Sequence, residues 1–473
     1  MGLRFKYLIS FLLFSAFLQA QQPWSLQKCV EHAIAHNTTI AQSEINQLSA
    51  GINYKTARQA RLPNLNMNVN GGFNSGRFIN PATNDFESAN VGFNSYSLGG
   101  GLLVFGSGVI KNSVEQANIN LKSTEMTTLA AKQNIMLNVA SSYISILYAM
   151  ENLAAANNQI KILNEQKDQT SKLINAGLRP SGDILEIEAR IADADRNIVS
   201  AENALDLNYL IMKNLLKLSP GEPFSIETPD ISIEELLTSK DYTFEEVYDY
   251  AIQSRPEIQA AEYNIKSAQL GEKVAKSNLY PRLTAGYSLS SNFSTAGKRI
   301  NRYEEDIISN TVIFQGNEAE LGFKQNIPIF EDNPYFNQLN ENFGFGVSAG
   351  LSVPIYNNYT NSSRYQLAEL QTRTAELRKQ ETLDQLANAI QQAIADNSAA
   401  RKEYEAAIKS YEANAKSLEN IEKKFNAGSA SSFELSTANN NVLSAEISRI
   451  IAKYRLLFTK KVVDFYMGET IEL

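Results

Sequence analysis

Two histidines are the residues whose spacing comes nearest to that of a metal site. His32 and His36 lie four positions apart, and on a helix this spacing places both imidazole rings on one face. A zinc site needs at least three protein ligands, and the sequence offers no third ligand nearby. Exposed histidines, or histidines with ordinary hydrogen-bond partners, are therefore the favoured interpretation, and the sequence predicts no metal.

Motifs that would indicate an enzyme are missing from the sequence. There is no GxxxxGK[ST] phosphate loop, no HExxH and no CxxC. The stretch Gly344-x-Gly346-x-x-x-Gly350 lies within a strand-like segment, and its spacing is wrong for a dinucleotide. The single cysteine, Cys29, excludes an intrachain disulfide, and residues 26–28 lack the small side chains of a lipoprotein site. We therefore expect that the chain is not an enzyme and needs no cofactor.

Residues 1–20 have the pattern of a secretory signal peptide. Arg4 and Lys6 precede an apolar stretch at residues 7–18, and Gln19-Ala20 provide a cleavage site. An uncleaved N-terminal anchor is the alternative, although the stretch is too short to span a membrane and no later apolar helix reaches that length. Loss of the two cations would change the formal net charge from −8 to −10. That balance argues against nucleic acid as a partner.

The sequence repeats itself once. Residues 26–65 align with residues 244–283 at an offset of 218, and Asn175-Ala176-Gly177 aligns with Asn426-Ala427-Gly428 at an offset of 251. The difference between the two offsets, 251 − 218 = 33 residues, predicts an insertion in the second copy between about residues 294 and 342. The proline-rich residues 219–242 join the two copies.

A seven-residue spacing of apolar and small side chains predicts long, supercoiled helices. The clearest seam consists of Leu383, Ile390, Asn397, Tyr404, Tyr411, Leu418 and Phe425. Residues 109–175 and 358–426 contain neither proline nor glycine, so each predicts one helix of roughly 100 Å. Each helix is expected to end at a glycine, Gly177 or Gly428. Periodicity alone leaves a plain coiled-coil rod open as an alternative.

Four segments alternate apolar and polar side chains as strands do, and they are residues 64–70, 96–104, 283–290 and 343–355. Alternating segments of roughly ten residues are typical of outer-membrane strands. A soluble sheet gives the same alternation, but these strands stand between coiled-coil helices of an exported chain. Four strands cannot close a barrel in lipid. Two subunits would give a filled barrel of eight strands and three an open one of twelve, so we expect a homotrimer in contact with outer-membrane lipid.

The repeated pattern resembles a known family. Ser25-Leu26, Ala33-Ile34, Asn37 and Leu62-Pro63-x-Leu65 have counterparts in the second copy, and both copies carry the Asn-Ala-Gly turn. In order and spacing the chain resembles the TolC-like outer-membrane efflux protein family. The resemblance implies an α+β membrane protein with a trimeric twelve-stranded barrel, four strands per subunit, continued by a long periplasmic α-helical coiled-coil barrel. It also implies a passive exit duct that works with a periplasmic adaptor and an inner-membrane pump.

Two other functions remain open at this point. One is the exit channel of a type I protein secretion system, which belongs to the same family. The other is a periplasmic coiled-coil scaffold without a pore. The expected organisation is a signal peptide at 1–20, a first copy at 21–218, a linker at 219–242 and a second copy at 243–473. Within the copies we expect hairpins at about 64–105 and 282–356, the latter with an outer loop at 294–342, and long helices at about 108–176, 181–218, 358–427 and 431–467.

The family resemblance also implies a gate just after the two helical turns. Asp183 and Glu434 fall at the acidic positions, and Phe425 falls where an aromatic tyrosine often stands. Ala430 and Thr437 replace the arginine and the second aspartate of some members, so a lock would need other partners. A helix cap is the alternative role for Glu434, because Ser431-x-x-Glu434 forms a capping box. Candidates for docking the adaptor or pump are Asn175, Ala176, Gly177, Asn426, Ala427 and Gly428.

Overall fold

The computed structural model describes residues 23–79, 86–229, 237–238, 240–314 and 316–469. The described residues form two compact units, and the chain passes between the units after Ile52, Ala117, Ser267 and Leu370. Each unit combines parts of both sequence copies, so neither copy is compact by itself. The expected signal peptide, residues 1–20, lies outside the described residues.

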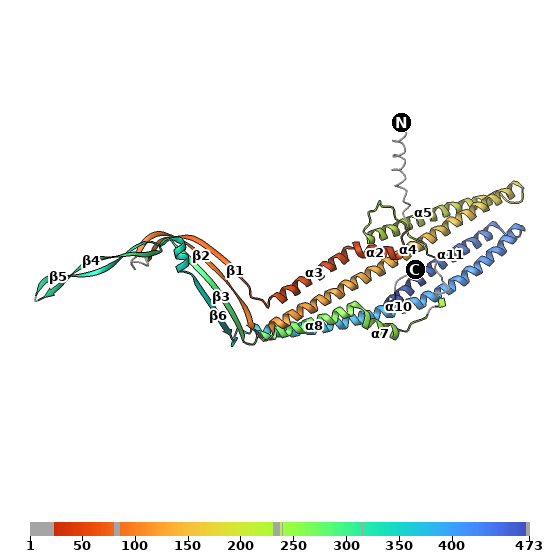
Figure 1. Cartoon of the computed structure of the whole chain (residues 1–473). Coiled ribbons are helices and arrows are strands. Elements are labelled where there is room, and N and C mark those ends of the chain that lie inside the picture. Colours follow the sequence, from red (N-terminus) through yellow and green to blue (C-terminus); the bar gives the residue numbers. More distant parts are fainter. Residues whose placement is uncertain (1–22, 80–85, 230–236, 239, 315, 470–473) are drawn as a thin grey trace, which may run out of the picture. The chain divides into compact units, whose positions relative to one another are not determined.

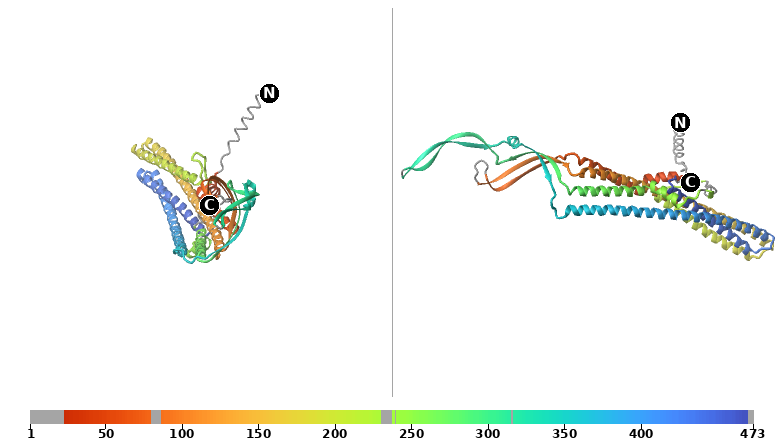
Figure 2. Two further views of the ribbon diagram at one scale, coloured as in Figure 1. Left: turned by 90° about the vertical axis from the view of Figure 1, so that its left-hand side faces the viewer. Right: turned by 90° about the horizontal axis from the view of Figure 1, so that it is seen from below.

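Helices at corresponding places in the two copies have equal lengths. The pairs are α2 (Leu26–His36) and α7 (Phe244–Ser254) with 11 residues, α3 (Thr38–Gln59) and α8 (Pro256–Ser277) with 22, α4 (Val109–Asn175) and α10 (Thr360–Asn426) with 67, and α5 (Gly182–Leu216) and α11 (Ser432–Tyr466) with 35. At 1.5 Å per residue, α4 and α10 are each roughly 100 Å long. Figures 1 and 2 show α4 with α5, and α10 with α11, as two helical hairpins.

The helix starts follow from local chemistry. Ser25 caps α2 by accepting a hydrogen bond from the Lys28 backbone N–H. Thr243 and Glu246 form a reciprocal capping box at the start of α7. Helix α8 begins with Pro256, a residue suited to this position because it has no N–H to leave unpaired and its φ is already helical. The described helices include none with a stretch long and apolar enough to cross a membrane.

One unit comprises the described residues up to Ile52, Asn118–Ser267 and those from Gln371 onward, and we call it the helical unit. Its core lies along the seven-residue seams. Val139, Ile146 and Ile390 are fully buried there. Tyr143 is also buried, and its hydroxyl donates hydrogen bonds to the carbonyl oxygens of Trp24 (3.1 Å) and Glu227 (2.8 Å). Burial raises the pKa of the Tyr143 phenol, so the hydroxyl remains a donor. The two hydrogen bonds of Tyr143 connect Glu227, in the segment after α5, with Trp24 near the start of the first copy.

The other unit contains a four-stranded antiparallel sheet in the order β1-β2-β3-β6. The strands are β1 (Asn66–Ile79), β2 (Phe86–Phe105), β3 (Arg282–Ser294) and β6 (Gly344–Ser352). Strand β6 ends before Pro354, short of the alternating pattern that runs to residue 355, because proline has no N–H for a sheet ladder. The β1–β2 strands continue well beyond the roughly ten residues that the alternation indicated.

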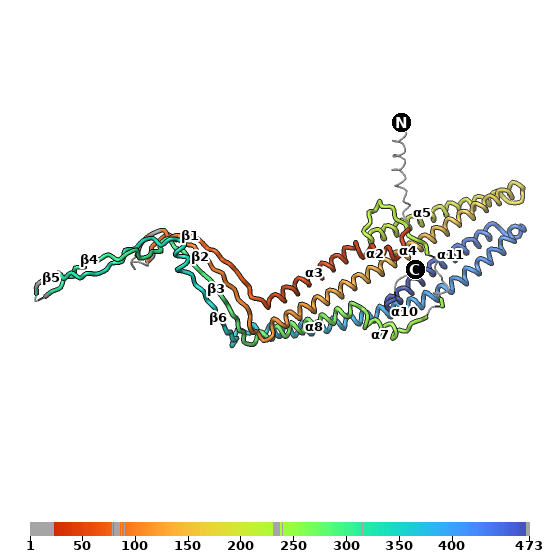
Figure 3. The backbone as a smooth tube through the Cα atoms, viewed as in Figure 1, coloured from red at the N-terminus to blue at the C-terminus, as the bar shows by residue number. Residues whose placement is uncertain are grey.

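The segment 294–342, expected as an outer loop, contains regular structure. Strands β4 (Lys298–Phe314) and β5 (Asn317–Asp332) form a separate two-stranded sheet, and the backbone trace in Figure 3 follows the two strands side by side. Helix α9 (Tyr335–Glu341) then leads into β6. The long ladder is possible because β-branched and aromatic residues, which favour strands, recur through the insertion.

Candidate gate at the helical turns

Both helical hairpins turn in the same way. Gly177 and Gly428 have φ values of 72° and 74°, in the left-handed region. The N–H of Gly177 donates to the Ile174 carbonyl, and that of Leu178 donates to the Leu173 carbonyl, each at 2.9 Å. These two bonds form a Schellman motif, which ends a helix and satisfies its last carbonyls. The second turn repeats both bonds.

The six docking candidates lie at these turns. Asn175, Ala176, Gly177, Asn426, Ala427 and Gly428 are all exposed. A Cβ atom at either glycine would have no described neighbour within 4 Å. The glycines are therefore required by backbone conformation and not by crowding.

Glu434 acts as a cap on its own helix. Its Oε2 accepts hydrogen bonds from the Ser431 backbone N–H (2.8 Å) and hydroxyl (3.0 Å), and the Ser431 Oγ accepts one from the Glu434 N–H (3.2 Å). The hydrogen bonds from Ser431 hold the pKa of this carboxyl below its usual range. Glu434 is exposed. Every bond the structure gives its side chain is therefore local to the start of α11.

Asp183 holds the matching position in the first copy but has different partners. Its Oδ2 accepts a hydrogen bond of 2.7 Å from the hydroxyl of Ser432, 249 residues away on the other hairpin. The same oxygen lies 3.7 Å from Arg179 Nη1. As far as the described residues show, Ser181 at the start of α5 makes no side-chain capping bond. Among the described residues, the acidic side chain of the first copy thus joins the two hairpins, whereas Glu434 of the second copy bonds to Ser431 of its own hairpin.

Arg179 is the residue of this site that sequence reasoning missed. Its Nη2 donates to the carbonyl oxygens of Phe425 (3.2 Å) and Ala430 (3.1 Å). Its guanidinium carbon lies 4.0 Å from the centre of the Phe425 ring, within reach of a cation–π interaction. The 251-residue offset aligns Arg179 with Ala430, the position at which some family members have a gate arginine. This correspondence between positions 179 and 430 is the sequence signal that points to Arg179.

An apolar cluster supports these polar contacts. Phe425 is 5% exposed and packs with Ala430 and Leu435. Leu173 of the other hairpin packs against the same cluster. A few residues further along, Arg190 Nη1 donates to the Ser436 carbonyl at 3.0 Å. We call Arg179, Asp183, Phe425, Ala430 and Ser432 the tip cluster.

Thr437 lies outside the tip cluster. Its hydroxyl donates to the Phe433 carbonyl of its own helix at 2.8 Å. The two histidines also make local contacts: their rings stack at 4.1 Å, and His36 Nδ1 donates to the His32 carbonyl. Burial lowers the pKa of His32. Within the described part of the chain, no three His, Cys, Asp or Glu side chains are grouped to hold a metal.

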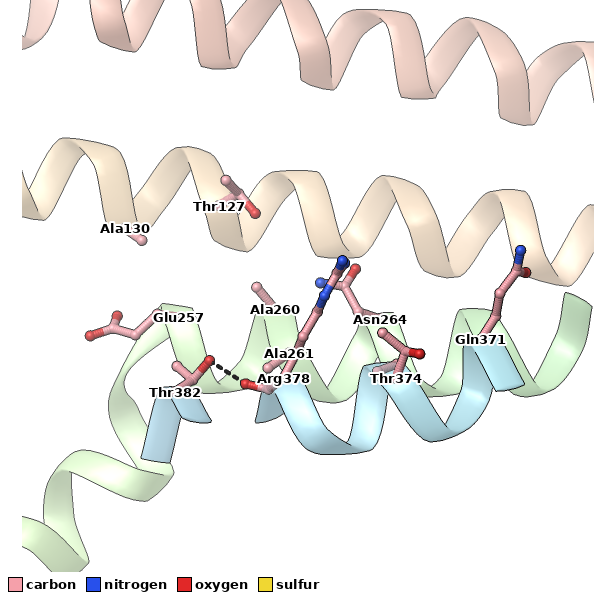
Figure 4. A pocket seen from close by; sticks show the side chains of 11 residues that line it. Thr127, Ala130, Glu257, Ala260, Ala261, Asn264, Gln371, Thr374, Arg378 and Thr382 are labelled. Carbon is pink, nitrogen blue, oxygen red and sulfur yellow. Dashed lines mark hydrogen bonds between the residues drawn. The ribbon is translucent and has the colours of Figure 1, made fainter. Parts of the chain in front are cut away.

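A groove of about 660 Å³ lies between α4, α8 and α10 in the helical unit (Figure 4). Most of the side chains that line it are small, among them Ala130, Ala260 and Ala261. On the α8 wall, Asn264 accepts a 2.7 Å hydrogen bond from Ser123 of α4. The dashed line in Figure 4 joins the Thr382 hydroxyl to the Arg378 carbonyl, 2.8 Å away within α10. These contacts make the groove a feature of helix packing.

Comparison with known proteins identifies the family. The model of the outer membrane efflux protein family matches residues 29–216 and 247–469. The chain belongs to this family, as a TolC-like outer-membrane factor, and it is accordingly an outer-membrane protein. The two matched stretches run from Cys29 in α2 to the end of α5, and from Val247 in α7 to Glu469, just past the end of α11.

Among its relatives is the outer membrane efflux protein BepC of Brucella suis, which is 20% identical over 87% of this chain and 79% of the relative. Outer membrane protein TolC of Salmonella enteritidis is 22% identical over 45% of this chain and 47% of the relative, so the chain spans about half of TolC in that alignment. Among solved structures, CusC has a TM-score of 0.76 at 14% identity, covering 95% of this chain and 93% of CusC. VceC of Vibrio cholerae has a TM-score of 0.73 at 13% identity, covering 94% and 97%. These likenesses show the fold, a strand region combined with long helices.

Proposed function

We propose that this chain is the outer-membrane duct of a tripartite efflux system. In this proposal three copies form one channel, which an inner-membrane pump feeds through a periplasmic adaptor. The duct itself is passive, and its cargo is a small toxic molecule such as a drug or a metal ion. The relatives that match the chain include a fusaric acid resistance protein of Burkholderia cepacia and a toxin and drug export protein of Aggregatibacter actinomycetemcomitans.

The observation that carries the proposal is the alternation of rows across the four-stranded sheet. Met67, Leu98, Leu289 and Phe345 form one row through the observed register. The neighbouring row consists of Asn68, Ser97, Ser290 and Gly344. One face of the sheet is therefore apolar and the other polar, and this is the pattern of a strand set with lipid on one side and water on the other.

The edges of the sheet support assembly from several copies. Strands β1 and β6 are at the two ends of the strand order, and among the described residues each pairs with one neighbour only. An open edge is not tolerated in lipid, because its backbone groups have no water to bond. We propose that β6 of one copy pairs with β1 of the next. Three copies then give twelve strands, enough for an open bore.

The helices support a tunnel and a gate. Equal helix lengths in the two copies favour an internal repeat whose halves serve as equivalent staves of one helical barrel. The tip cluster lies where the two hairpins turn, and its polar contacts cross from one hairpin to the other. We propose that it holds the hairpins together in a closed periplasmic mouth, and that the exposed turns contact the adaptor or the pump.

Two adjacent residues of β6 provide a matched test of the channel. Val347 belongs to the apolar face and Ser348 to the polar face. Arginine on a lipid-facing position near mid-membrane costs roughly 2–4 kcal/mol. We expect Val347→Arg to reduce the amount of heat-sensitive trimer in the outer membrane, and Ser348→Arg to assemble normally with altered conductance in planar bilayers. A soluble monomer from the unaltered chain, or equal assembly defects in both variants, would refute the duct.

The cargo needs a separate experiment. A strain that lacks the chain should become sensitive to small toxic compounds, and the gene should restore resistance only together with a pump and an adaptor. Loss of a secreted polypeptide, with unchanged sensitivity to small compounds, would favour type I secretion. If the chain were a scaffold that other channels require, its loss would impair both protein secretion and drug export. In that case the purified chain should show no conductance in planar bilayers.

A further inference from the structure

The β4–β5 ribbon, residues 298–332, is long for a sheet of two strands. The two strands are paired in register from Lys298 with Asp332 to Phe314 with Asn317, interrupted by one bulge near Ile300. At 3.4 Å per residue, the ladder extends over roughly 50 Å. Among the described residues no third strand joins it. A two-stranded sheet is marginally stable in water by itself, so some other surface is needed to stabilise the ribbon.

The base of the ribbon is firmly attached to β3. Gln338 of α9 is buried, accepts a hydrogen bond from the Ser294 N–H (3.0 Å) and donates to the carbonyls of Ser294 (2.9 Å) and Asn333 (2.8 Å). The Tyr335 hydroxyl shares a 2.6 Å hydrogen bond with the hydroxyl of Tyr96 on β2. The ribbon therefore starts from a defined place, beside the connection into β6.

Beyond its base the ribbon has two unlike faces. Ile308 pairs with Phe323, and Leu321 and Ile327 lie on the same face by register. Ile308, Leu321 and Phe323 are 37%, 49% and 56% exposed. The opposite face is more polar, and on it Lys324 and Glu305 form a 3.2 Å ion pair. An apolar face bordered by two open strand edges would cause aggregation if it stayed uncovered.

We propose that this apolar face packs against a neighbouring copy of the chain in the trimer; the inference rests on the proposed function. The ribbon returns through α9 directly into β6, the edge strand that joins the next copy in that assembly. Another copy is thus the chain nearest to the ribbon. Glu304 and Asp306 share the face of Ile308 by register, and carboxylates of this kind oppose insertion into lipid.

The size of the face sets the expected effect. A ribbon roughly 50 Å long and two strands, about 10 Å, wide offers on the order of 500 Å² to a neighbour. This is below the roughly 800 Å² that each partner buries in a typical specific interface. The contact therefore adds to the stability of a trimer that the barrel already forms, and loss of the contact should weaken the trimer without abolishing it.

Adjacent isoleucines on opposite faces give the test. Ile308→Asp should lower the temperature at which the purified trimer dissociates on gels by several degrees, whereas Ile307→Asp on the polar face should leave it unchanged. Equal shifts in the two variants would overturn the proposal. Because an aspartate could also disturb the ribbon itself, a second measurement uses cysteine, a small and mildly apolar replacement.

Leu321 lies on the apolar face and Ile313 on the polar face, so the variants Leu321→Cys and Ile313→Cys place one thiol on each face. In the detergent-purified trimer, a water-soluble maleimide should label Leu321→Cys at least about tenfold more slowly than Ile313→Cys. The native Cys29 is buried and should not contribute. Equal labelling of the two variants in the trimer would refute packing between copies. Protection of Leu321→Cys in cells that disappears in detergent would also refute it, because lipid would then cover the face. Failure of the unaltered chain to form a trimer would instead overturn the proposed function on which this inference rests.

Discussion

Removal of Arg179 should open the proposed gate, and the structure allows the effect to be estimated. Arg179→Ala deletes two hydrogen bonds, to the carbonyls of Phe425 and Ala430, and the contact with the Phe425 ring. A hydrogen bond from a charged group contributes about 1.5 kcal/mol or more. The Arg179 side chain is 13% exposed, so water replaces part of that loss. We therefore expect the contact between the hairpins to weaken by about 2–3 kcal/mol.

A change of that size alters the ratio of open to closed tips by about 30- to 150-fold, because 1.4 kcal/mol corresponds to a factor of ten. The assay is single-channel recording in planar bilayers at fixed salt. Arg179→Ala should raise the conductance or the open fraction. Arg196→Ala is the matched control, since Arg196 is an exposed arginine of α5 whose ion pair with Asp193 lies within that helix.

A double-mutant cycle separates the partners of Arg179. The oxygen of Asp183 lies 3.7 Å from Arg179 Nη1, beyond hydrogen-bond distance, so Arg179→Ala and Asp183→Ala should be coupled by no more than about 1 kcal/mol. Asp183→Ala alone removes the bond that the charged carboxylate accepts from Ser432, worth about 1.5 kcal/mol, and should open the tip by a smaller factor, about tenfold. If Arg179→Ala behaves like Arg196→Ala, the tip cluster is not a gate.

Three further predictions concern the turns, the cap and the thiol. Gly177→Ala should lower the urea midpoint of the purified protein, because a left-handed alanine costs about 1–2 kcal/mol of stability. Gly51→Ala inside α3 should raise the midpoint, because alanine stabilises a helix interior by about 0.5–1 kcal/mol relative to glycine. A higher midpoint for Gly177→Ala would contradict the turn geometry. Glu434→Ala should destabilise the start of α11 at neutral pH and leave conductance unchanged. Because the pKa of Glu434 is lowered on folding, its contribution is complete above the ordinary glutamate pKa and is lost as the pH falls through the folded value, so melting curves of variant and parent should converge in acid. Burial raises the pKa of the Cys29 thiol to about 12, so a disulfide reagent at pH 8 should react with it only after denaturation.

Much of the fold follows from patterns that local geometry enforces. A seven-residue spacing keeps one side of a helix buried only if the helices supercoil, and Val139, Ile146 and Ile390 are indeed fully buried. The glycines after Asn175 and Asn426 have the left-handed conformation that a Schellman turn requires. Strand faces could also be predicted, because successive side chains of a strand point in opposite directions.

The sequence pattern of the insertion between β3 and β6 indicates less about its structure. Its alternation is imperfect, since Glu304 and Asp306 share a face with Ile308. Its partner strand lies within the same insertion, so the offset between the two copies has no counterpart for it. Its length was predictable, but the ribbon and α9 became visible only with the register of β4 on β5.

The sequence by itself predicted two copies of one helical and strand pattern. It also predicted that the helices at residues 109–175 and 358–426 each end in a glycine turn, with an acidic residue soon after it. Only the tertiary structure decided that these acidic residues differ in role. Glu434 bonds to Ser431, three positions away, while Asp183 bonds to Ser432 across 249 residues. The same holds for Arg179, whose acceptors are carbonyl oxygens of the other hairpin. A backbone carbonyl has no signature in the side-chain sequence, and so the partner of such a residue emerges only when distant segments pack together.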